Sequence, residues 1–147
     1  MSLQDWLRNG WLVEHKTSRE EIANLLAVAD RDLADCRTHG LSADWRLNIA
    51  YNAALQPATA ALAAAGYRAP REAHHYRVVQ SLAYTIGADS KTIVEFDKFR
   101  KKRNIGEYER AGLVSDQEAE EMIALAKRLR KTVEEWLYVQ HPELMEE

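Results

Sequence analysis

Two segments that each place a glutamate three residues after a serine, residues 18–21 (Ser-Arg-Glu-Glu) and 115–118 (Ser-Asp-Gln-Glu), constrain the fold most strongly. In such a capping box the serine side chain accepts a hydrogen bond from the glutamate N–H, and the glutamate reaches back to the serine N–H. Apolar residues then recur at helical spacing: Ile22, Leu25, Leu26, Ala29 and Leu33 follow the first box, and Met122, Leu125, Ala126, Leu129, Val133 and Trp136 follow the second. The two boxes therefore predict long amphipathic helices, which end near Gly40 and Val139.

The same start and stop signals divide the rest of the chain. Ser42 is placed to cap a helix that Gly66 would end. Pro57 falls inside this helix and cannot donate a hydrogen bond to the carbonyl of Ala53, so we expect a kink or a split there. Three further helices are predicted: a short one over residues 3–14 that is broken near Gly10, one over about residues 71–86 after Pro70, and one that Asp89 or Ser90 caps and that continues through residues 99–108.

The pattern of the whole chain predicts an all-α fold. No segment alternates apolar and polar residues with a period of two, so we expect no strands. Long helices joined by short connections favour an antiparallel up-and-down bundle. No repeat, linker or low-complexity stretch calls for a second domain. We therefore predict one domain, residues 1–147, with a bundle of about five helices over residues 18–139 and the short helix of residues 3–14 before it.

Charge and cysteine content narrow the class of protein. The 147 residues carry a formal charge of -3, so nucleic-acid contact would have to come from a local basic patch. The single cysteine, Cys36, allows no intrachain disulfide, and a cytoplasmic setting is the simplest expectation. We find neither a signal-peptide pattern nor an apolar run long enough to span a bilayer, and so expect no membrane partner.

The sequence carries no recognisable metal, cofactor or nucleophile motif. No two histidines have the His-x-x-x-His spacing that places ligands on one helix face; the five are His15, His39, His74, His75 and His141. Cys36 has no histidine nearby in the sequence to activate it. Glycine-rich phosphate loops and dinucleotide fingerprints are also missing. We predict no metal site and no cofactor.

The helix that starts near Ser90 carries an unusual buried face. Ile93 and Phe96 define its inward side, and continuing at about 100° per residue leads to polar residues: Arg100, Arg103, Asn104 and Glu107. The lysines of this segment are predicted to point away from the core: Lys98, Lys101 and Lys102. Buried charges need partners and mark functional sites more often than scaffolds. Gly106 adds to this reading, because glycine inside a helix costs about 1 kcal/mol relative to alanine.

An ion-pair network is the structural explanation for the same residues. Arg103 precedes Glu107 by four positions, so these two share a helix face. Arg100 follows Asp97 by three positions and precedes Asn104 by four, so either could be its partner. Exposed pairs of this kind contribute little to stability. The sequence leaves the functional and the structural explanations open.

Together with two other segments, the polar patch resembles the HEPN superfamily. The resemblance rests on the order of helices, on residues 49–56 (Ile-Ala-Tyr-Asn-Ala-Ala-Leu-Gln), on residues 66–68 (Gly-Tyr-Arg) and on the pattern Arg103-Asn104-x-x-x-Tyr108. It implies a small helical bundle that forms a homodimer and pairs two copies of its signature helix across a cleft.

The family motif is an arginine, a polar residue and, a few residues later, a histidine, and in active members it serves metal-independent RNA cleavage. Arg103 matches the arginine and Asn104 the polar residue, but Tyr108 stands where the histidine would be. An arginine would bind the scissile phosphate and stabilise its developing charge. Tyrosine, with a reference pKa of about 10, is a poor general base. His74 or His75 could enter the cleft from another helix, but the sequence does not place them there.

The resemblance thus implies a HEPN-like homodimer with an Arg-rich cleft facing RNA or a nucleotide. If the motif is active, the expected activity is that of a metal-independent ribonuclease in a toxin–antitoxin or RNA-processing system. The predicted catalytic residues are Arg103, Asn104 and Tyr108, and the predicted phosphate- and RNA-binding residues are Arg100, Lys101, Lys102 and Glu107. The alternative is a catalytically degenerate module that dimerises and docks a partner nucleotidyltransferase.

Overall fold

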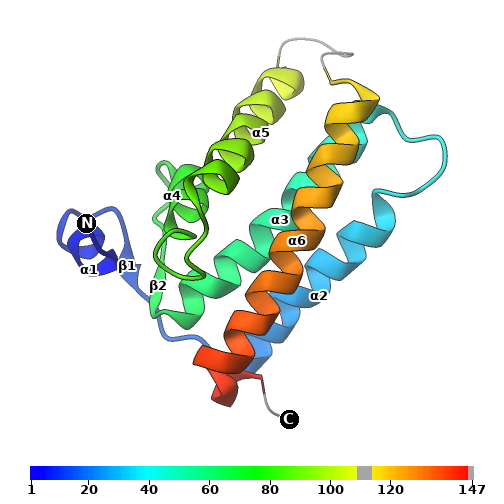
Figure 1. Cartoon of the computed structure of the whole chain (residues 1–147). Coiled ribbons are helices and arrows are strands. Elements are labelled where there is room, and N and C mark those ends of the chain that lie inside the picture. Colours follow the sequence, from blue (N-terminus) through cyan, green and yellow to red (C-terminus); the bar gives the residue numbers. More distant parts are fainter. Residues whose placement is uncertain (109–113, 146–147) are drawn as a thin grey trace.

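The computed structural model of the chain describes the backbone of residues 1–108 and 114–145, and the side chains of residues 1–103 and 114–145. Its helices are α1 (Leu3–Arg8), α2 (Arg19–Asp35), α3 (Ala43–Ala64), α4 (His74–Ser81), α5 (Ser90–Tyr108), α6 (Asp116–Gln140) and a 3₁₀ turn, η1 (Pro142–Leu144). The long helices alternate in direction, with α2 and α5 running opposite to α3 and α6 (Figure 1). The predicted all-α bundle is confirmed.

The serines that the sequence marks as caps do begin helices. The Ser115 hydroxyl accepts from the Glu118 N–H and the Glu118 carboxylate accepts from the Ser115 N–H, both at 3.1 Å, which completes one capping box. Ser18 likewise accepts from the N–H of Glu21 at 3.1 Å. The Glu21 carboxylate, however, accepts a 2.7 Å bond from the hydroxyl of Thr17. The start of α2 is therefore where we predict it, with the serine half of the capping box formed and the Glu21 side chain bonded to Thr17.

A short pair of strands corrects the expectation of no strands. β1 (Val13–Glu14) pairs antiparallel with β2 (Tyr67–Arg68), with Val13 opposite Arg68. Gly66, at a φ of 101°, turns the chain out of α3 and directly into β2. Two residues are too few to give a period-two pattern, and this is why the sequence does not reveal them.

The central helix α3 is continuous, so the predicted split at Pro57 is wrong. The helix extends over 22 residues and Pro57 is buried within it. Proline removes one intrahelical hydrogen bond, but α3 packs against α2, α4, α5 and α6. This packing keeps the chain helical on both sides of Pro57 despite the missing bond.

Two other helices are shorter than the sequence indicates. α1 ends at Arg8, so the predicted break near Gly10, which has a φ of 77°, is confirmed, but the chain is not helical beyond it to residue 14. α4 begins after Ala73 instead of at residue 71, because Ala73 adopts a left-handed φ of 53° that a right-handed helix cannot include. The turns at residues 82–86 also lie outside α4. The result is an eight-residue helix set against α3 and α5.

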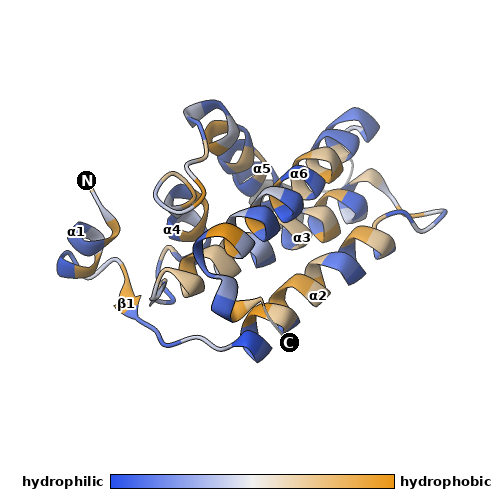
Figure 2. Cartoon of the chain, turned by 60° about the horizontal axis from the view of Figure 1, so that its bottom comes forward, coloured by the Kyte–Doolittle hydropathy of each residue, from blue (hydrophilic) through white to orange (hydrophobic). Residues whose placement is uncertain are grey.

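The core lies between the faces of these helices. Hydrophobic and hydrophilic colours alternate along α2 and α6 in Figure 2, as expected of helices with one face buried. Tyr51 of α3 and Phe96 and Phe99 of α5 are among the largest fully buried side chains. Within the described part of the chain, no helix combines the length and the apolar composition needed to cross a membrane.

Candidate functional site

The two arginines of α5 face inward, as the helical spacing predicts. The Arg103 guanidinium lies 5.3 Å from the centroid of the Tyr51 ring, and its Nε atom is buried. The Arg100 side chain is 19% exposed, and its Nε donates a 2.7 Å hydrogen bond to Asp97. The Arg100 guanidinium also lies 5.4 Å from the Tyr76 ring centroid. α5 thus presents two cations to aromatic residues of α3 and α4, an arrangement that is electrostatically attractive.

The lysines of α5 line a groove on its other side. Lys101 is exposed and lies 3.4 Å from a carboxylate oxygen of Asp97. Lys102 is only 31% exposed, because it pairs with Glu118 of α6 at 3.5 Å; the prediction that it points away from the protein is therefore only partly right. Lys98 is exposed, as predicted. The structure separates the basic segment into two inner arginines and three outer lysines.

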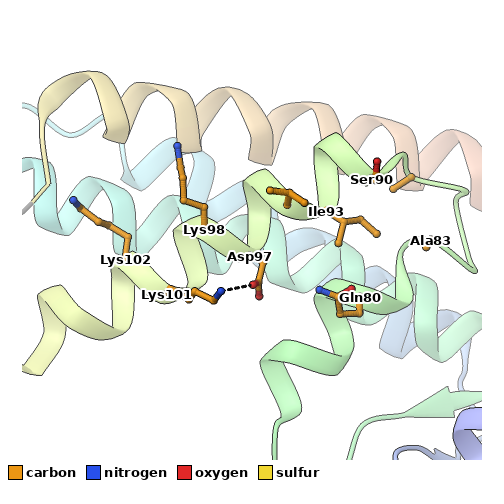
Figure 3. A pocket seen from close by; sticks show the side chains of 10 residues that line it. Gln80, Ala83, Ser90, Ile93, Asp97, Lys98, Lys101 and Lys102 are labelled. Carbon is orange, nitrogen blue, oxygen red and sulfur yellow. Dashed lines mark ion pairs between the residues drawn. The ribbon is translucent and has the colours of Figure 1, made fainter.

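The groove has a volume of about 690 Å³ and extends along α5 beside the end of α4. Its lining residues are Gln80, Ala83, Ala88, Ser90, Ile93, Val94, Asp97, Lys98, Lys101 and Lys102. In Figure 3 Lys98 and Lys102 lie toward one end of the groove, whereas Ala83, Ile93 and Ser90 lie toward the other. The ion pair between Lys101 and Asp97 lies in between. The groove therefore has a cationic end and a mainly apolar end.

Tyr51 connects the inner arginines to a histidine. Its side chain is 1% exposed, and its hydroxyl lies 3.3 Å from Nδ1 of His75 on α4. The Phe96 ring packs edge-on against it at 5.5 Å between centroids. Burial raises the pKa of the Tyr51 hydroxyl well above its ordinary value, although the Arg103 and Arg100 cations act in the opposite direction. Tyr51 is therefore a neutral hydroxyl at physiological pH.

The two histidines of α4 have different surroundings. His74 Nδ1 lies 3.0 Å from the carbonyl oxygen of Ala69, and because a carbonyl can only accept, this nitrogen is the donor. His75 instead contacts Tyr51, and its ring centroid lies 5.7 Å from the tyrosine ring. The sequence names both histidines as candidates and distinguishes neither. The structure brings His75 to the tyrosine that Arg103 covers.

The position of α4 depends on aromatic residues near the N-terminus. The Arg77 guanidinium lies 4.0 Å from the Trp11 ring centroid and 5.5 Å from that of Trp6. Trp6 is 5% exposed and packs edge-on against Tyr84, at 5.3 Å between centroids. These contacts hold the helix that carries His75 in place against the bundle.

Three predicted site residues have side chains outside the described part of the structure: Asn104, Glu107 and Tyr108. Their backbone belongs to α5. Of the ion pairs expected from the structural explanation, Arg100–Asp97 is present. The pair of Arg103 with Glu107 involves a side chain that is not described, and it stays a prediction.

The remaining chemical candidates do not form a site among the described residues. Cys36 is fully buried, its thiol lies 3.2 Å from the Leu33 carbonyl, and burial raises the pKa of the thiol. A raised thiol pKa disfavours the reactive thiolate. No group of three or more histidine, cysteine, aspartate or glutamate side chains in the described ranges could hold a metal ion.

Comparisons of the chain with protein-family models, with curated proteins and with solved structures found no match.

Proposed function

We propose that the protein binds RNA or a nucleotide through the phosphate groups, at the basic segment of α5. The observation that carries the proposal is the concentration of cations there. Five of the six residues from 98 to 103 are lysine or arginine, in a chain with a net charge of -3. Such a local patch is the electrostatic requirement for phosphate binding by a protein that is not basic overall.

The two groups of cations would have different roles. Lys98 and Lys101 are exposed at the groove, where they can contact phosphates without sequence preference. Arg103 lies on the inward-facing side of α5, against Tyr51, and its planar guanidinium can bind a phosphate through two N–H groups. The lysines would attract and align the strand, and Arg103 would fix one phosphate.

The reaction that fits such a site is metal-independent cleavage of RNA. Arg103 would stabilise the charge that develops on the scissile phosphate, and the Tyr51 ring beneath it supports the guanidinium. A homodimer that pairs two copies of α5 across a cleft, and a role in a toxin–antitoxin or RNA-processing system, belong to the same proposal. They rest on the resemblance to the HEPN superfamily.

The test is incubation of the purified protein with a mixed transfer-RNA pool in excess EDTA. The wild type should bind and cleave the RNA, whereas Arg103→Ala should bind at least about tenfold more weakly and not cleave. Arg37→Ala is the matched control, because Arg37 is an exposed arginine on another part of the chain. Unfolding of Arg103→Ala in circular dichroism would mean that the arginine is structural, and the site assignment would fail.

A docking module without catalysis is the second candidate, and the internal pairing of the cations favours it. Asp97 binds both Arg100 and Lys101, which reduces the charge available to RNA. Val94 is 67% exposed on the groove, as a contact residue for a partner would be. If the wild type fails to bind RNA, the docking function becomes the favoured one. Val94→Asp should then abolish co-elution with a nucleotidyltransferase from the same organism and preserve the helical spectrum.

A further inference from the structure

We infer that His75 is the proton-transfer group of the site, in the role that Tyr108 is poorly suited to fill. The inference rests on the proposed RNA-binding function and extends it to a specific residue. His75 and Arg103 come from different helices and both contact Tyr51. The site therefore combines a guanidinium for the phosphate with an imidazole for the proton.

Tyr51 positions the imidazole. The 3.3 Å contact joins the tyrosine hydroxyl to Nδ1 of His75, and burial keeps that hydroxyl neutral. When Nδ1–H donates to the tyrosine oxygen, Nε2 carries the lone pair and can accept a proton. His75 is half-buried, whereas Tyr51 is 1% exposed, so the imidazole is the part of the pair that substrate can reach. Tyr51 is thus a positioning residue and His75 the catalytic one.

The neighbouring histidine, His74, has a similar Nδ1 hydrogen bond but different neighbours. His74 donates its Nδ1 proton to the carbonyl of Ala69, within the turn that leads into α4. Among the described residues, His74 contacts neither Tyr51 nor an inner arginine. The centroid of its ring lies 5.8 Å from the centroid of the His75 ring. The pair of histidines therefore offers a matched comparison on one helix.

The proposed cleavage of RNA needs neither a metal ion nor a co-reactant. The ribose 2′-oxygen forms a bond to phosphorus, and the bond from phosphorus to the 5′-oxygen of the next nucleotide breaks. Nε2 of His75 takes the 2′-hydroxyl proton and returns it to the leaving 5′-oxygen. Arg103 stabilises the negative charge on the non-bridging oxygens. The products are a 2′,3′-cyclic phosphate and a 5′-hydroxyl.

Two separate measurements test the inference: affinity for a fluorescent single-stranded RNA, and cleavage of the same RNA in excess EDTA. His75→Ala should slow cleavage by about 100-fold or more, with affinity unchanged within about twofold, and added imidazole should restore part of the rate. His74→Ala should cleave within a few-fold of wild type. Tyr51→Phe keeps the ring under Arg103 and removes the hydroxyl, and it should slow cleavage while preserving affinity.

The outcomes separate the inference from the function on which it rests. If the wild-type protein does not bind the RNA, the proposed RNA-binding function is wrong, and the inference is wrong with it. Binding without cleavage by the wild type would overturn the inference alone. Cleavage by His75→Ala at the wild-type rate, or equal loss in His74→Ala with retained melting temperature, would also overturn it. Products with a 3′-hydroxyl and a 5′-phosphate would contradict the proposed reaction.

Discussion

The hydroxyl of Tyr51 on α3 lies 3.3 Å from Nδ1 of His75 on α4. Because the Arg103 guanidinium of α5 lies against the same tyrosine ring, three helices meet at one buried side chain. Tyr51 is fixed in turn by the edge of the Phe96 ring. Substitution of this tyrosine should therefore change both the stability of the protein and the rate of RNA cleavage. The choice of the substituted residue separates the two effects.

Tyr51→Phe should change the stability of the protein most at alkaline pH. Burial raises the pKa of Tyr51 in the folded state, so above about pH 10 the unfolded chain loses this proton while the folded protein keeps it. The free energy of unfolding of the wild type should consequently fall as pH rises past that value, and the Phe variant should lack this part of the decline. Urea unfolding at about pH 8 and about pH 11 measures the difference.

The exposed tyrosine Tyr138, which is 55% exposed, provides the control. Tyr138→Phe should keep the alkaline decline of the wild type. At neutral pH, Tyr51→Phe should cost about 1 kcal/mol through the lost hydrogen bond. An alkaline decline of wild-type size in Tyr51→Phe would show that the buried hydroxyl is not its source.

Lys101→Ala should weaken RNA binding mildly and lower its salt dependence. Each phosphate contact to a single strand contributes about 0.7 to the slope of log affinity against log salt concentration. Lys101 is 66% exposed at the groove, so its removal should reduce the slope by about that amount. Lys102→Ala should give a smaller reduction, because Lys102 also pairs with Glu118. Fluorescence anisotropy titrations over a series of salt concentrations provide the slopes.

Lys131 of α6 is exposed and lies outside the basic segment of α5, which makes Lys131→Ala the matched control. Its slope should equal that of the wild type. An unchanged slope in both Lys101→Ala and Lys102→Ala would mean that these lysines are solvated surface and make no phosphate contact.

Asp97→Asn should strengthen RNA binding by a few-fold. The Asp97 carboxylate binds Arg100 at 2.7 Å and Lys101 at 3.4 Å, and it is the acidic residue among those that line the groove. Removing its charge leaves two cations less compensated and raises the local positive potential. Anisotropy at low salt measures the gain, which should shrink at high salt. Weaker binding would mean that Asp97 holds Arg100 in a required orientation.

Much of the bundle could be predicted because its signals are local. Capping at Ser115 and the inward facing of Ile93, Arg100 and Arg103 depend on residues three or four positions apart, and helical geometry fixes their relations. The Arg100–Asp97 pair is of this kind. Helix ends were less predictable, since the left-handed conformation of Ala73 has no signature in an alanine.

The contact of His75 with Tyr51 could not be predicted because it joins residues 24 positions apart on separate helices. It depends on how α4 packs against α3, which is fixed by contacts such as that of Arg77 with Trp11. Two adjacent histidines differ by about 100° in direction on a helix, and the sequence does not say which one faces inward. The pairing of β1 with β2 also joins residues far apart in the chain, Val13 and Arg68, and its two-residue strands leave no period-two pattern to detect.

Arg130→Ala should destabilise the bundle by about 1 kcal/mol, and so lower the melting temperature by about 3 °C. Arg130 of α6 makes two 3.0 Å hydrogen bonds to Asp30 of α2 and a 3.0 Å ion pair with Glu134, and its side chain is 17% exposed. Arg128→Ala is the control, since Arg128 is 58% exposed and has a single 3.1 Å bond, to Glu95. It should cost less than about 0.5 kcal/mol.

Differential scanning calorimetry at low and high salt distinguishes the origin of the effect. Asp30 is 58% exposed, so salt should screen part of the Arg130 contribution, and the difference between wild type and Arg130→Ala should narrow. The part that persists at high salt reflects the packing of the arginine stem between α2 and α6. Equal melting temperatures for Arg130→Ala and the wild type at low salt would show that apolar packing alone holds α2 against α6.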